Sequence, residues 1–99
     1  MAENPLAVFE RLDPELLKML GDNRQLAFAD GALPRKSKLL IAMALDAAHG
    51  ASEGVGSLAR QALKAGATKQ EIAETLRIAH LICGAGSIYT AAQGLKGLF

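Results

Sequence analysis

The sequence predicts an all-α fold, a compact single-domain bundle of about five helices. Hydrophobic residues make up 51% of the chain and aromatic residues only 4%, with no Trp, so the core is aliphatic and rich in Ala. Such small side chains let helices approach closely, and Ala and Leu are strong helix formers. No alternating strand pattern, Asn-Gly turn or internal repeat appears. A chain of 99 residues has room for one core, which we place in residues 13–99, after an N-terminal arm of residues 1–12.

The arm is expected to be irregular or briefly helical. The next residues carry the signals of a helix start. Asp13 can cap free backbone amides, Pro14 suits the first turn of a helix, and Glu15 complements the helix dipole. We therefore expect the first long helix over residues 14–29.

A second helix is expected over residues 34–49, because the preceding stretch "DGALP" supplies turn residues and another first-turn proline. It is apolar almost all round between residues 39 and 48, which predicts a central, buried helix. Gly50 should end or kink it. A nearly all-apolar helix in so small a domain offers more apolar surface than one core can hide. We therefore expect a homo-oligomer.

The third helix, over about residues 52–65, has a clear amphipathic pattern and is stopped by Gly66. Its apolar residues recur at the three- and four-residue spacing of a single helix face: Val55, Leu58, Ala59, Ala62 and Leu63.

The fourth helix should begin at "TKQE", residues 68–71, which has the pattern of a capping box, and run to about residue 82. The Gly-rich stretch "CGAGS", residues 83–87, is expected to break the chain. A last helix is expected over about residues 88–98.

Composition narrows the classes of function. The formal charge is +1 and basic residues are scattered among acids, so we expect no nucleic-acid partner. A single cysteine excludes an internal disulfide. The opening residues do not resemble a secretion signal, and the longest apolar run, "LLIAMAL", is far below the roughly 20 residues that span a bilayer. We expect a cytoplasmic protein without membrane contact.

The order of these features resembles a known family. The stretches "LPRKSKLLIAMALDAAHG" and "ALKAGATKQEIAETLRIAHLICGAGSIYTAA" are similar to the carboxymuconolactone decarboxylase family, which includes the alkylhydroperoxidase D-like proteins. The most specific piece is "KAGATKQEI", which joins a helix-stopping glycine to a capping box. This resemblance implies an all-helical fold and a homotrimer or homohexamer.

The peroxidase branch of that family carries a Cys-x-x-Cys pair with a glutamate upstream and a histidine downstream. The resemblance places the two cysteine positions at Ala51 and Gly54, the histidine at Leu58 and the glutamate at Leu39. A thiol peroxidase needs a reactive thiolate and usually a second thiol to resolve its oxidised form. We therefore expect thiol peroxidase activity to be absent, with Cys83 a small buried hydrophobic residue.

The remaining candidates for chemistry lie near the junction of the second and third predicted helices. Asp46, His49 and Glu53 are spaced so that they would share a helix face or cluster about a break at Gly50. A histidine held by a carboxylate is a suitable general acid or base, which favours His49 as the proton carrier. The alternative is that His49 caps the end of the second helix.

His80, late in the fourth predicted helix, could line the same pocket as His49 or be a core histidine with one hydrogen bond. We expect no metal and no cofactor. Two hypotheses for the function follow. One is a decarboxylase-like lyase or isomerase that acts on a small carboxylated substrate through acid and base groups. The other is a non-catalytic oligomeric binding or accessory protein.

Overall fold

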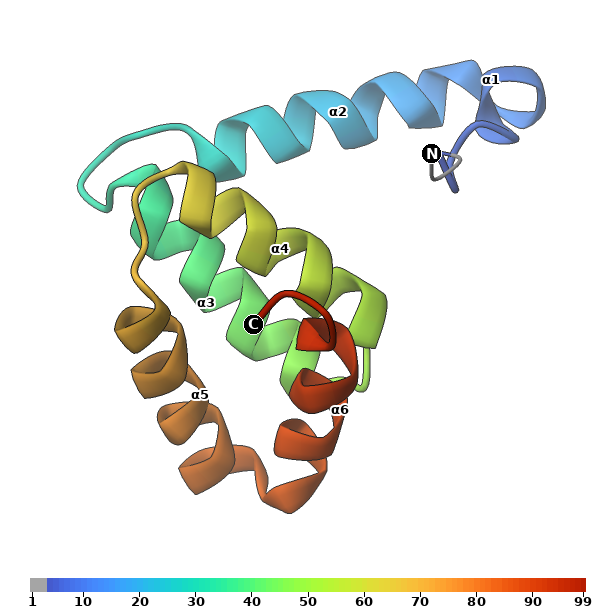
Figure 1. The fold of residues 1–99 in the computed structure, drawn as a ribbon. Coiled ribbons are helices and arrows are strands. Elements are labelled where there is room, and N and C mark those ends of the chain that lie inside the picture. The colour runs from blue at the N-terminus through green and yellow to red at the C-terminus, as the bar shows by residue number, and fades with distance from the viewer. Residues whose placement is uncertain (1–3) are drawn as a thin grey trace.

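A computed structural model describes residues 4–99, which form six helices and no strand (Figure 1). The helices are α1 (Phe9–Leu12), α2 (Pro14–Phe28), α3 (Arg35–Ala48), α4 (Ser52–Lys64), α5 (Lys69–Cys83) and α6 (Ala85–Leu95). The all-α prediction is confirmed, with the short α1 added by the N-terminal arm.

Helices α3 to α6 form the body of the molecule. Helix α3 packs on α4 and α5, and α6 packs against both of those helices, so the four enclose a common core. The fully buried side chains of Leu39, Met43 and Val55 lie there among alanines. Helix α2 crosses one end of the α3–α4 pair, and α1 extends beyond the body (Figure 1).

Local sequence signals set the helix starts as expected. The Asp13 side chain accepts a hydrogen bond from the Leu16 amide at 3.0 Å, which caps α2. Thr68 and Glu71 form the predicted capping box, each side chain accepting from the other residue's backbone amide. Gly50 ends α3 with φ of 79°, a backbone conformation that favours glycine.

The last helix differs from the prediction. The break that we expected over residues 83–87 is limited to Gly84, which has φ of 88°, and α6 already begins at Ala85. The Ser87 hydroxyl donates to the Gly84 carbonyl at 2.7 Å, so this buried serine is satisfied within the first turn. Gly86 and Ser87 lie in the first turn of α6, where the backbone amides have no partner within the helix. Residues that form helices poorly are therefore tolerated there.

An ion pair joins α3 to α5. The Lys36 ammonium lies 3.0 Å from a Glu71 carboxylate oxygen, while the other oxygen accepts from the Thr68 amide at 2.9 Å. The Thr68 backbone hydrogen bond, followed by the bond from Lys36, lowers the pKa of Glu71 below its ordinary value of 4.5. The capping box therefore also fixes the position of α5 against α3.

Helices α4 and α6 approach closely where Gly56 faces Gly94. A Cβ atom on Gly94 would overlap the Ser52 carbonyl oxygen and come within 2.9 Å of the Val55 Cβ. A Cβ on Gly56 would meet the Gly94 carbonyl oxygen at 2.5 Å. Only glycine at both positions permits this crossing.

The second predicted helix is central, as expected, because α3 contacts α2, α4, α5 and α6, but in this single chain it is buried on one side only. Leu39, Met43 and Ala47 of α3 are buried, whereas Ile41 and Leu45 are 49% and 55% exposed. Within residues 4–99 we find no helix with both the length and the apolar character to cross a bilayer.

Candidate active site at the junction of α3 and α4

The turn between α3 and α4 brings Asp46 to the first turn of α4. The Ala51 amide donates to the Asp46 carbonyl oxygen at 2.9 Å, and the Ser52 amide donates to the Gly50 carbonyl oxygen at 3.1 Å. These bonds fold the chain back within three residues of the end of α3. Helix α4 therefore begins beside the last turn of the helix before it.

The Asp46 carboxylate packs directly on Gly54. An ideal Cβ atom at position 54 would overlap the Asp46 carboxylate oxygen, so the carboxylate occupies space that any other residue would fill. Asp46 is half-buried in this position. Gly54 lies in the first turn of α4, where the helix dipole favours a negative charge. The absence of a side chain at position 54 thus leaves the space that the carboxylate occupies.

A pocket of about 310 Å³ opens beside this carboxylate. Helix α2 covers one side of it, and α3 and α4 supply the rest. Its lining residues are Arg24, Phe28, Ala42, Asp46, Gly54, Ser57, Leu58 and Gln61.

Polar groups in the pocket form a short chain of hydrogen bonds. The Arg24 guanidinium donates to the Gln61 Oε1 at 3.1 Å, and the Gln61 Nε2 donates to the Ser57 Oγ at 3.2 Å. Arg24 also lies over the Phe28 ring, with Cζ 4.9 Å from the ring centroid. The pocket therefore combines a cation from α2 with a carboxylate from α3 and a hydroxyl and an amide from α4.

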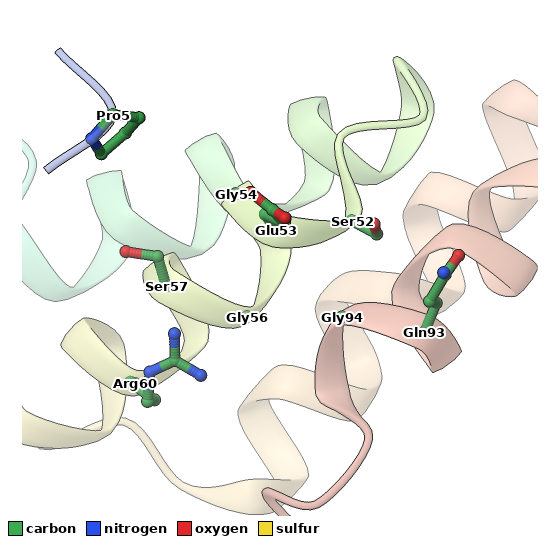
Figure 2. Close-up of a pocket in the computed structure, with 9 residues that line it drawn as sticks. All are labelled: Pro5, Ser52, Glu53, Gly54, Gly56, Ser57, Arg60, Gln93 and Gly94. Atoms are coloured by element: carbon green, nitrogen blue, oxygen red, sulfur yellow. The ribbon is translucent and has the colours of Figure 1, made fainter. Parts of the chain in front are cut away.

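A larger, open depression of about 790 Å³ adjoins this pocket and shares Gly54 and Ser57 with it (Figure 2). Figure 2 shows its wall on α4, with Gln93 and Gly94 of α6 on one side and Pro5 of the N-terminal segment on the other. Glu53 and Arg60 are its charged residues.

The chain's matches to known proteins agree with this architecture. The sequence pattern of the carboxymuconolactone decarboxylase family matches residues 14–96. The chain belongs to the carboxymuconolactone decarboxylase family. Its structure is similar to the crystal structure of an apo carboxymuconolactone decarboxylase family protein from Legionella pneumophila, with a TM-score of 0.85 and 38% sequence identity. The similarity covers 92% of this chain and 81% of the Legionella chain. No curated protein matches the chain.

The peroxidase positions of the carboxymuconolactone decarboxylase family are apolar or small here, as the resemblance indicates. Leu39 and Leu58 are both buried in the hydrophobic core, with exposed fractions of 0% and 7%. Ala51 is exposed just before α4, and Gly54 lies under Asp46. The positions that the resemblance gives to the peroxidase glutamate and histidine are therefore part of the apolar core in this family member.

The four residues that the sequence singles out are only partly brought together. Asp46 lines the smaller pocket and Glu53 lines the larger one, so both lie at the α3–α4 junction. His49 is exposed as the C-cap residue of α3, because that helix ends at Ala48. His80 is exposed in the last turn of α5, and neither histidine lines these two pockets.

Two interpretations of residues on α5 are wrong. His80 and Cys83 are exposed, whereas the sequence suggested a core histidine and a buried cysteine. The buried residues of α5 are Ile72, Leu76 and Ala79, and the helical turn carries the residue after Ala79 away from that side. Among residues 4–99 no three His, Cys, Asp or Glu side chains gather closely enough to bind a metal ion.

Sequence reasoning missed Arg24, Ser57 and Gln61. Ser57 and Gln61 follow Glu53 at steps of four, so a polar stripe along α4 is visible in the sequence. Arg24 carries no comparable signal, because its hydrogen bond joins residues 37 positions apart. Only the packing of α2 across the α3–α4 pair reveals it.

Proposed function

We propose that this protein carries out acid and base chemistry on a small carboxylated substrate, as a decarboxylase-like lyase or an isomerase. The observation that carries the proposal is the Asp46 carboxylate seated on Gly54, in a pocket that also holds the Arg24 guanidinium. A proton-transfer group and an anion-binding group therefore face the same space. Membership of the carboxymuconolactone decarboxylase family supports a substrate of this kind.

Each polar residue has a role in this proposal. Arg24 binds the substrate carboxylate, exchanging its hydrogen bond to Gln61 for a stronger bond to an anion. Asp46 transfers the proton. In a decarboxylation Asp46 passes a proton taken up from solvent to the carbon that loses carbon dioxide, so each turnover consumes one proton. In an isomerisation the Asp46 carboxylate removes a proton from one carbon and returns it to another. Ser57 and Gln61 orient the substrate through its oxygen atoms.

A non-catalytic binding or accessory protein is the second candidate. It is favoured by the position of the two histidines, because histidine is the side chain most often used for proton transfer at neutral pH. Both are exposed and neither lines the pocket, which leaves Asp46 as its one carboxylate. Thiol peroxidase activity is disfavoured because the cysteine pair is absent.

The test combines ligand binding with turnover. A panel of small lactones is screened by thermal shift, and each lactone is used in two forms, one with a carboxylate and one with an amide in its place. A ligand that binds the folded protein raises the melting temperature of the protein. Asp46→Asn should abolish turnover of any substrate found while preserving binding. Arg24→Gln should weaken binding of the carboxylate compound and leave binding of the amide unchanged.

Two further variants sharpen the test. Gly54→Ala keeps the Asp46 carboxylate but displaces it, and should therefore lose activity as Asp46→Asn does. Gly86→Ala, at a helical glycine with no atom within 4 Å of its added methyl, is the matched control. His49→Gln should retain activity. If Asp46→Asn kept full turnover, or if His49→Gln lost it, Asp46 would not be the proton carrier. Binding without any turnover would favour the accessory protein.

A further inference from the structure

Helix α2 exposes an apolar stripe. Leu16, Met19 and Leu26 follow one another along the helix with Asn23, at steps of three and four, which is the spacing of a helix-packing seam. Leu16 is half-buried. Met19 and Leu26 are 60% and 77% exposed. Arg24, which is turned toward α4, lies on a different side of the helix. We call the three apolar residues the α2 stripe.

The body of the same chain provides little support for this helix. None of the 15 residues of α2 is buried, and its attachment to the core is made by Phe28 in its last turn. Isolated helices of this length are marginal in water, and α2 carries Gly21 in its middle. A surface that covers the α2 stripe would therefore stabilise this helix.

A second apolar surface lies between α3 and α5. There a groove of about 400 Å³ is lined by Ile41, Leu45 and Ile78, together with smaller neighbours. These three side chains are 49%, 55% and 65% exposed, and Ile82, one turn beyond Ile78, is 75% exposed. No residue of α2 lines the groove, so a chain does not fill its own α3–α5 groove.

We propose that the α3–α5 groove binds the α2 stripe of a second copy of this chain. Their lengths agree, since Leu16 to Leu26 spans about 15 Å of helix and the groove wall from Ser37 to Leu45 about 12 Å. Both surfaces are apolar, and an amphipathic helix in a hydrophobic groove is a common mode of recognition.

The second copy is favoured over a foreign partner because one arrangement covers both surfaces. In a reciprocal exchange each chain donates its α2 stripe and receives that of the other chain. A foreign partner on the groove would leave Met19 and Leu26 in water. Two reciprocal contacts bury twice the area of one, which brings the pair toward the roughly 1,200 Å² that a stable interface needs.

The experiment uses opposite charges on the two surfaces. Leu26→Lys places a cation on the stripe and Ile78→Glu places an anion in the groove, both at exposed positions, so the body should fold in each variant. The wild-type protein should be an oligomer at micromolar concentration, measured by sedimentation velocity. Each variant alone should be monomeric. Ala73→Glu, at an exposed position on another side of α5, is the control and should remain assembled.

Mixing the two variants decides the arrangement. In a mixed dimer one contact is wild type on both sides, and the other pairs the lysine introduced on one stripe with the glutamate introduced in the opposite groove. The mixture should therefore recover at least dimeric mass, which an unfolded variant could not do. The proposal is overturned by a monomeric wild type, by a mixture that stays monomeric, or by single variants that stay assembled. It is also overturned if Ile78→Glu dissociates while Leu26→Lys does not, since the groove would then pack on a surface other than α2.

Discussion

Replacement of Gly94 by alanine should destabilise the protein through a single added methyl group. That methyl would overlap the Ser52 carbonyl oxygen and lie 2.9 Å from the Val55 Cβ and 3.1 Å from the Gly56 nitrogen. Two of these three atoms belong to the α4 backbone, which cannot rotate away as a side chain can. Helices α4 and α6 must therefore separate, which loosens the packing around the fully buried Val55.

The expected loss is about 2 kcal/mol, within the range of about 1–3 kcal/mol for overpacking a close-packed site. Alanine normally favours a helix over glycine by up to about 1 kcal/mol, but this gain is small at the penultimate residue of α6. Urea denaturation at fixed protein concentration measures the change, with Gly86→Ala in the same helix as the control. A Gly94→Ala protein as stable as the control would show that the two helices do not pack as closely as described.

Two further outcomes are expected. Because the folded-state pKa of Glu71 is lowered, its contribution to stability is complete above the ordinary value of 4.5 and is lost as the pH falls through the lowered value. Denaturation series at several pH values should therefore show Glu71→Gln less stable than the wild type at neutral pH and approaching it in acid, whereas the exposed Glu74→Gln should match the wild type throughout. Cys83→Ser should leave stability and ligand binding unchanged, because the thiol is exposed at the end of α5. Turnover of an organic hydroperoxide that is lost in this variant would contradict the assignment of Asp46 as the reacting group.

The predictable parts of the fold are those with a local cause. Asp13 and Thr68 cap helices through residues three positions away, and Gly50 ends a helix through its own φ angle, so all three are legible in the sequence. The start of α6 was misplaced because a run rich in glycine and serine resembles a loop, although only Gly84 leaves the helical conformation.

The site was predictable to the same extent. The position of Asp46 at the α3–α4 junction could be predicted, because Asp46 lies a few residues from the break at Gly50. Arg24 lies near Gln61 and Asp46 because of the way α2 crosses the bundle, and this crossing leaves no pattern in the sequence. The exposure of His80 depends on the side of α5 that faces the core. Its apolar neighbours Leu81 and Ile82 suggested burial, but they are themselves 79% and 75% exposed.

The packing of Asp46 on Gly54 also constrains the order in which substitutions can accumulate. A cysteine at position 54, where the peroxidase branch has one of its sulfurs, would meet the Asp46 carboxylate before it could meet any substrate. The Asp46 side chain would have to rotate away or be replaced by a smaller residue, and either change takes the carboxylate off Gly54. The effects of substitutions at positions 46 and 54 are therefore expected to depend strongly on each other, so that the double variant differs from the sum of the single ones.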